Sequence, residues 1–149
     1  MANHYYIISE ASFFNSINDN AIHDFILETG IDLKQSCYSK MPTVSEIKKI
    51  LIEYRLHATE IFNQNGRIEL IASKNNTESI GLVFTQIEDE NEPVDMFRIL
   101  RGSHTDTVID FVKFLTISYG NFLYYCDSGI MSLITKDKDS EIIKNELNM

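Results

Sequence analysis

Residues 61–72 read IFNQNGRIELIA and contain the strongest fold signal of the chain. The Asn65-Gly66 pair is typical of a two-residue hairpin turn, because both central residues of a type I′ turn need a positive φ angle. Beyond the turn, apolar residues occupy every second position, as in a half-buried strand: Ile68, Leu70 and Ala72. The stretch therefore predicts two antiparallel strands joined by a tight turn.

Two further strands are predicted after this hairpin, over residues 80–87 and 94–100. Both are rich in β-branched and apolar residues, which suit a half-buried pleated surface. An acidic loop that contains Pro93 separates them. Together with the hairpin, these strands predict an antiparallel meander of four strands.

The part of the chain before the meander begins with a predicted strand over residues 5–8 and a predicted helix over residues 16–29. Ser16 and Asp19 resemble a capping box at the start of this helix. Gly30 is suited to end it, because glycine adopts the left-handed backbone conformation of a helix C-cap at little cost. This region therefore predicts one strand followed by one long helix.

Two more helices are predicted from their end signals. Thr43 and Glu46 have the spacing of a capping box, followed by the buried stripe of a second helix. Ser103 and Asp106 are expected to cap a third helix, and Gly120 is expected to end it.

The chain closes with a predicted hairpin, whose strands cover residues 122–126 and 130–135. Residues 136–149 form a charged tail that either frays or forms a short helix. Strands come in runs instead of alternating with helices, which favours an α+β fold. We expect a single domain over residues 1–149, with a mainly antiparallel sheet of about six to seven strands and three helices packed against it.

Composition limits the possible classes of protein. With 149 residues, 44% of them hydrophobic, the chain is long enough for a core that needs no metal or disulfide. Cys37 and Cys126 are too few for a structural zinc site, and we interpret both as reduced thiols. Neither a signal peptide nor an apolar run long enough to span a membrane is apparent, so a cytoplasmic location is expected.

Charge is the feature that departs most from an ordinary composition. The formal net charge of −9 argues against binding to nucleic acid or to an anionic membrane. Residues 1–33 and 75–97 together carry eleven acids and no Lys or Arg. Such an acidic surface either attracts a basic partner or simply keeps the protein soluble. The predicted partner-binding residues are the acids of the first helix and of the loop: Asp24, Glu28, Glu88, Asp89, Glu90, Glu92 and Asp95.

No motif predicts a cofactor or a metal ion. The four histidines lack metal-ligand spacing, and the glycines form no phosphate-binding pattern. The most enzyme-like group is His104 with Asp106, near the expected start of a helix, with Ser128 as a further candidate. His104 and Asp106 are also typical of a capped helix start and Ser128 of a hairpin turn, and we favour these structural interpretations.

The segment over residues 108–134 is a predicted helix that ends in Ser118-Tyr119-Gly120, followed by a strand and the Asp127-Ser128-Gly129 turn. This ending resembles that of small immunity proteins that accompany bacterial polymorphic and contact-dependent growth-inhibition toxins. The resemblance implies a non-catalytic inhibitor whose acidic surface covers the active site of a cognate basic toxin, often a nuclease.

Two other hypotheses remain open. A free edge of the predicted sheet would allow a homodimer, in which the edge pairs with that of a second copy, and the protein would then be an interaction module or scaffold. A small enzyme using His104 and Asp106 is the other alternative.

Overall fold

The structure, a computed structural model, describes residues 4–31, 39–54, 56–75 and 77–149, without the side chains of Asp19 and Ile22. Seven strands are present in this part of the chain: β1 (Tyr5–Ser9), β2 (His57–Gln64), β3 (Arg67–Ser73), β4 (Ser79–Phe84), β5 (Phe97–Ile99), β6 (Phe122–Cys126) and β7 (Met131–Ile134). They form one antiparallel sheet in the order β2-β3-β4-β5-β1-β6-β7.

The predicted α+β fold and its antiparallel sheet are confirmed. The described residues form five helices instead of three: α1 (Glu10–Ser16), α2 (Asp19–Thr29), α3 (Val44–Glu53), α4 (Thr105–Tyr119) and α5 (Ser140–Glu146). Within this part of the chain, no helix combines the length and the apolar character needed to cross a bilayer.

The predicted four-stranded meander is confirmed as β2 to β5, which are neighbours in the sheet in their chain order. Asn65 and Gly66 have φ angles of 55° and 78°, as the hairpin turn requires. The predicted alternation along β3 is confirmed, because Ile68, Leu70 and Ala72 are buried beneath the helices.

Strand β1 lies in the middle of the sheet, although it comes first in the chain. Tyr5 faces Ile99 of β5 on one side and Cys126 of β6 on the other. Its neighbour two positions on, Ile7, is completely buried. This strand therefore joins the meander to the closing hairpin of β6 and β7.

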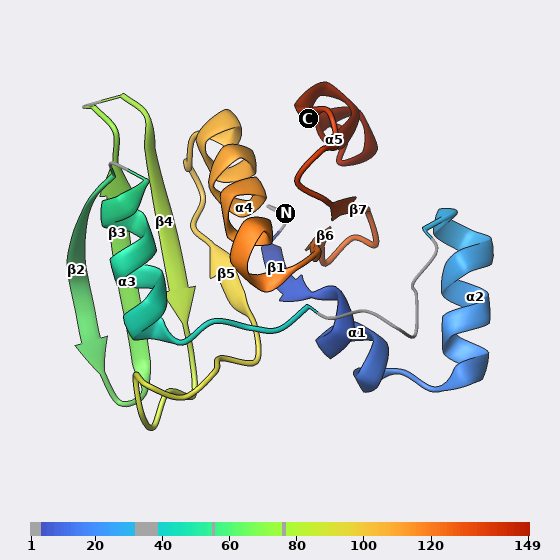
Figure 1. Cartoon of the computed structure of the whole chain (residues 1–149), viewed down its shortest axis with the longest axis horizontal. Coiled ribbons are helices and arrows are strands. Elements are labelled where there is room, and N and C mark those ends of the chain that lie inside the picture. The colour runs from blue at the N-terminus through green and yellow to red at the C-terminus, as the bar shows by residue number, and fades with distance from the viewer. Residues whose placement is uncertain (1–3, 32–38, 55, 76) are drawn as a thin grey trace.

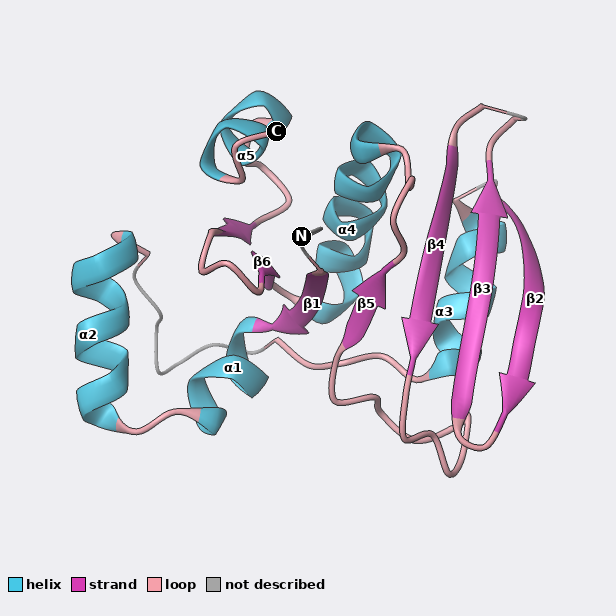
Figure 2. Ribbon diagram, turned by 180° about the vertical axis from the view of Figure 1, so that it is seen from behind, coloured by secondary structure: helices cyan, strands magenta, loops and turns pink. Residues whose placement is uncertain are grey.

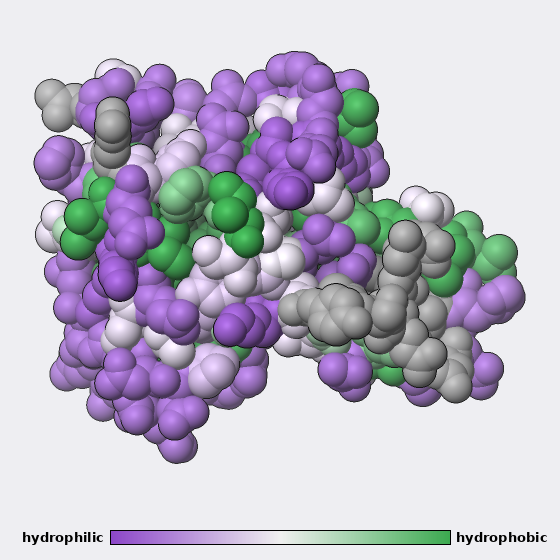
Figure 3. Space-filling view, in the orientation of Figure 1, coloured by the Kyte–Doolittle hydropathy of each residue, from purple (hydrophilic) through white to green (hydrophobic). Residues whose placement is uncertain are grey.

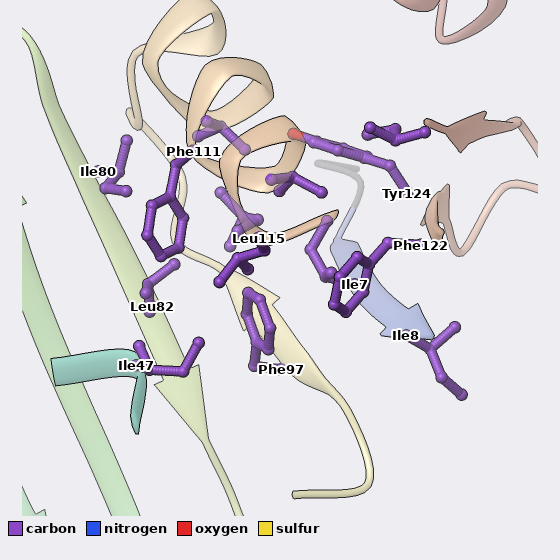
Figure 4. Close-up of a cluster of buried hydrophobic side chains, with 14 of the residues drawn as sticks. Ile7, Ile8, Ile47, Ile80, Leu82, Phe97, Phe111, Leu115, Phe122 and Tyr124 are labelled. Atoms are coloured by element: carbon purple, nitrogen blue, oxygen red, sulfur yellow. The ribbon is translucent and has the colours of Figure 1, made fainter. Parts of the chain in front are cut away.

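Helices α3 and α4 cover one face of the sheet (Figure 1), and the view from behind shows the opposite face of β2 to β5 without a helix over it (Figure 2). Side chains of both helices meet strand residues in one core (Figure 4). Its fully buried members include Ile47, Phe111 and Leu115 from the helices and Ile7, Leu82 and Phe122 from the strands. Burial of each such side chain stabilises the fold by roughly 1.5–3 kcal/mol.

The predicted long helix over residues 16–29 is wrong at its start, because this region forms two helices. Asn18, not Ser16, is the N-cap of α2, and its side chain accepts a hydrogen bond from the backbone N–H of Ala21. The Ser16 hydroxyl instead donates to the carbonyl oxygen of Phe13 at the end of α1. Asn and Ser cap helices about equally well, so the packing of α1 decides between them.

Helix α1 begins directly after β1 and packs on the face of the sheet opposite to α3 and α4. The Phe13 ring lies 6.4 Å from that of Tyr125 on β6 and 5.1 Å from that of Phe25 on α2. The predicted C-cap of α2 is confirmed, since Gly30 has a φ angle of 72°.

The predicted N-cap of α4 is also wrong. His104 holds that position without a side-chain capping bond, and the Ser103 hydroxyl donates to the Leu100 carbonyl and accepts from the Gly81 N–H. Ser103 therefore ties the β5–α4 connection to β4. The predicted end at Gly120 is confirmed.

Gly120 allows a close approach of two segments. Its φ angle is 80°, and a Cβ atom at this position would lie only 2.8 Å from the Cα atom of Ser39. Of the two predictions for the charged tail, a frayed end or a short helix, the helix is confirmed as α5, in which Ile143 is buried, as is Leu147 just after it.

Candidate partner-binding surface

The loop between β4 and β5 surrounds an open hollow of about 490 Å³. Residues 85–89 and 92–95 line it, and four of these residues are exposed acids: Glu88, Asp89, Glu92 and Asp95. The surface at this lower end of the molecule is largely hydrophilic (Figure 3). The structure thus brings four of the seven predicted partner-binding residues together.

Hydrogen bonds from both ends of this loop fix it to the rest of the fold. The Ile87 N–H donates to the Gly66 carbonyl in the β2–β3 turn at 2.8 Å, and the Val94 N–H donates to the Pro42 carbonyl at 3.0 Å. A loop backbone held in this way loses little conformational entropy when a partner binds.

Glu90, the fifth acid of the loop, points toward α3 and does not line the hollow. Its carboxylate lies 2.6 Å from the Nζ atom of Lys48, which also lies 3.6 Å from the carboxylate of Glu60 on β2. Burial acts to lower the pKa of Lys48, but the hydrogen bonds and charges of Glu90 and Glu60 together outweigh it, so the pKa is raised. Glu90 therefore links the loop to the fold.

The four acids of the hollow make no ion pair with any residue that the structure describes. The only hydrogen bond to one of these carboxylates from a described residue is that of Asp89, which accepts from the Asn91 N–H at 2.9 Å. Their negative field is therefore not neutralised by a neighbouring cation of the described chain. A concave surface lined by charges of one sign concentrates oppositely charged partners.

Asp24 and Glu28 lie apart from this hollow. Both are exposed on α2, which is at one end of the molecule in Figure 1 and Figure 2, whereas the β4–β5 loop lies below the meander at the other end. Asp24 and Glu28 therefore do not form one continuous patch with the acids of the hollow.

The enzyme-like residues have structural partners. The Nδ1 atom of His104 lies 2.7 Å from the hydroxyl oxygen of Thr107 in the first turn of α4. Asp106 forms an ion pair with Lys144 of α5, and the hydrogen bond from Lys144 is the largest cause of the lowered pKa of Asp106. Asp106 thus connects two helices and does not orient His104.

The remaining chemical candidates are likewise engaged or not described. The Ser128 hydroxyl donates to the Sγ atom of Cys126 at 3.1 Å, within the β6–β7 turn, and Cys126 is buried. Cys37 lies outside the described residues. Among the residues that the structure does describe, no group of three or more His, Cys, Asp or Glu is arranged to hold a metal ion.

Two features were missed in the sequence. The Tyr119 hydroxyl donates to the carboxylate of Glu46 at 2.5 Å, which joins the end of α4 to the start of α3. Along β2, all eight residues are exposed. The sequence of β2, HATEIFNQ, lacks a clear alternation of apolar and polar residues, and this absence was the available signal for a strand that buries neither face.

Comparisons with protein-family models, with curated proteins and with solved structures returned no match to this chain.

Proposed function

We propose that this chain is a cytoplasmic, non-catalytic binding protein that neutralises a cognate basic toxin, most simply a nuclease, by covering its active site. In this proposal it is an immunity protein. The observation that carries the proposal is the hollow between β4 and β5, where a loop fixed by backbone hydrogen bonds presents four carboxylates that form no ion pair with a described residue.

The chemistry of the proposed partner explains why such a surface would be effective. A nuclease binds a polyanion, so its active site is surrounded by Lys and Arg side chains. Carboxylates on a loop whose backbone is held in place can pair with the same cationic groups and thereby exclude the nucleic acid. Complementary charge also increases the rate of association at low salt by orders of magnitude.

Further support comes from the contrast between the acids of the loop. Glu90 is paired with Lys48. No such partner among the described side chains is present for the other four acids, Glu88, Asp89, Glu92 and Asp95. A binding role also agrees with the structural contacts of His104 and Asp106, since His104 lies against Thr107 and Asp106 is paired with Lys144. The likeness of residues 108–134 to immunity proteins points in the same direction.

The test begins with capture of partners from a lysate of the source organism and identification of the bound protein. Association is then measured for wild type and for a loop-neutral variant, which carries the changes Glu88→Gln, Asp89→Asn, Glu92→Gln and Asp95→Asn. The control neutralises two exposed acids outside the predicted partner-binding set, with Asp110→Asn and Asp137→Asn.

We expect a basic partner with toxic activity that one equivalent of this protein abolishes. Association should slow by roughly tenfold or more in the loop-neutral variant at low salt and remain unchanged in the control. The advantage of wild type should shrink as salt increases, because screening weakens the attraction. Equal association rates for wild type and the loop-neutral variant would remove the hollow from the interface.

A further inference from the structure

Among the strands that the structure describes, β2 forms one edge of the sheet and pairs only with β3. An edge strand leaves a row of backbone N–H and C=O groups free to pair with another chain. Natural proteins protect such edges with Pro, with Lys or with a bulge. β2 contains neither Pro nor Lys. Its only carboxylate, that of Glu60, is near Lys48, and its bulge lies after Glu60. The first half of β2, residues 57–60, is therefore unprotected.

A second hollow, of about 470 Å³, opens beside this unprotected half. It lies between the end of α3 and the start of β2, and Ile52, Leu56, His57, Ala58 and Thr59 line it. The Ile52 side chain is 70% exposed there, and Leu56 is buried behind it. The space suits a large apolar side chain from a strand that pairs with β2, as in other complexes formed by strand addition.

The other end of β2 reaches the acidic loop. The β2–β3 turn accepts the hydrogen bond from Ile87 at Gly66, and Lys48 connects Glu60 of β2 to Glu90 of the loop. Figure 1 shows β2 running from the end of α3 down to the side of the molecule where the loop lies. A strand of this length spans roughly 27 Å. The hollow beside Ile52 and the acidic hollow are thus near opposite ends of one free edge.

We propose that the edge of β2 accepts an extended segment of the basic partner, a mode that rests on the proposed function. The segment runs antiparallel to β2, like every neighbouring pair in this sheet. Its N-terminal end then carries Lys or Arg side chains toward the acidic hollow, and an apolar side chain near its C-terminal end enters the hollow beside Ile52. Charge selects this occupant over a second copy, because two copies each have a formal net charge of −9.

The probe is the peptide acetyl-Lys-Arg-Lys-Thr-Val-Thr-Val-Thr-Leu-amide. The reversed peptide, acetyl-Leu-Thr-Val-Thr-Val-Thr-Lys-Arg-Lys-amide, has the same composition and charge and serves as its control. Amide chemical shifts of the full-length protein, recorded by NMR during titration, locate the binding site and give its affinity. Ile52→Asp changes the hollow beside the start of β2, and Ile117→Asp, at an equally exposed position on α4, is its matched control.

We expect the first peptide to shift the amides of residues 57–64 and 88–95 and to bind at least tenfold more tightly than the reversed peptide. Ile52→Asp should weaken this binding about tenfold, and Ile117→Asp should not change it. The preference for the first peptide follows from the direction of the segment, and the effect of Ile52→Asp follows from its apolar contact.

Shifts confined to residues 88–95, with equal affinity for the two peptides, would overturn strand pairing and leave the proposed function standing. If the loop-neutral variant shows the same shifts at residues 57–64 as wild type, the acidic hollow does not bind the basic end of the segment. This result would overturn that part of the inference and would also count against the proposed function. The absence of any shift would overturn the inference. A dimer in sedimentation, with concentration-dependent broadening at residues 57–64, would overturn it in favour of a second copy.

Discussion

Neutralising the acids of the hollow should make the fold more stable, although it should weaken partner binding. The loop-neutral variant removes four negative charges that have no described cation beside them. It retains the one hydrogen bond that these side chains form with a described residue, because the amide oxygen of Asn accepts from the Asn91 N–H as the carboxylate of Asp89 does. The perturbation therefore isolates the electrostatic cost of the cluster.

The magnitude follows from Coulomb's law. Two unit charges about 8 Å apart in water repel by roughly 0.5 kcal/mol, and physiological salt reduces this value. The four acids are also near one another along the chain, so the unfolded state retains part of the same repulsion. The net gain in the free energy of unfolding should therefore be about 0.5–1 kcal/mol, or roughly 2–3 °C in Tm.

The assay is urea denaturation followed by circular dichroism, at low salt and at physiological salt. Glu90→Gln is the matched control, since it changes the one acid of the loop that is paired with Lys48. This pair is partly exposed, so its loss should cost only about 0.2–1 kcal/mol. The two variants are thus expected to change stability in opposite directions, and the gain of the loop-neutral variant should shrink as salt increases.

A loss of more than 1 kcal/mol in the loop-neutral variant would refute the reasoning. The acids would then support the fold, and their clustering would need no partner to explain it. A gain that does not depend on salt would refute the electrostatic cause and leave the binding hypothesis without its main physical argument.

Other positions give further tests. Gly120→Ala should destabilise the fold by about 3–5 kcal/mol in urea denaturation, because strain at a positive φ adds to a clash with backbone 2.8 Å away. Gly30→Ala, where the space is open, should cost only about 1–2 kcal/mol. Equal losses in the two variants would contradict this account. Phe111→Ala should cost about 3–5 kcal/mol, since the ring is fully buried. Burial and the hydrogen bond to Glu46 raise the pKa of Tyr119, so stability should fall as the pH rises above about 10. The hydrogen bond from Tyr119 lowers the pKa of Glu46, so stability should also fall as the pH drops below about 4. Tyr119→Phe should weaken both pH effects. Urea midpoints that do not change with pH would argue against a role for this pair in stability.

Signals that act over a few residues predicted the structure well. The capping box of Thr43 and Glu46 is present, with both of its hydrogen bonds, and the turn at Asn65-Gly66 joins two strands as expected. In each case the residue types determine a backbone conformation that needs no distant partner. The acids of the β4–β5 loop also cluster as expected, because they are close along the chain.

Features that depend on distant packing were not predictable in this way. Ser16 and Asn18 are both good helix caps, and the contact of α1 with β6 determines which one is used. The direction of Glu90 depends on Lys48 of a separate helix. For the same reason, the sequence alone did not show that α2 lies away from the acidic loop.

The central position of β1 has a consequence for synthesis of the protein in the cell. Tyr5 needs partners at Ile99 and Cys126, so this strand leaves the ribosome long before either of its neighbours. Until then its apolar side chains have no sheet to join, and they are a target for chaperones and for aggregation. Folding of the sheet should therefore be completed only after β6 has emerged, and such distant pairing predicts slow folding.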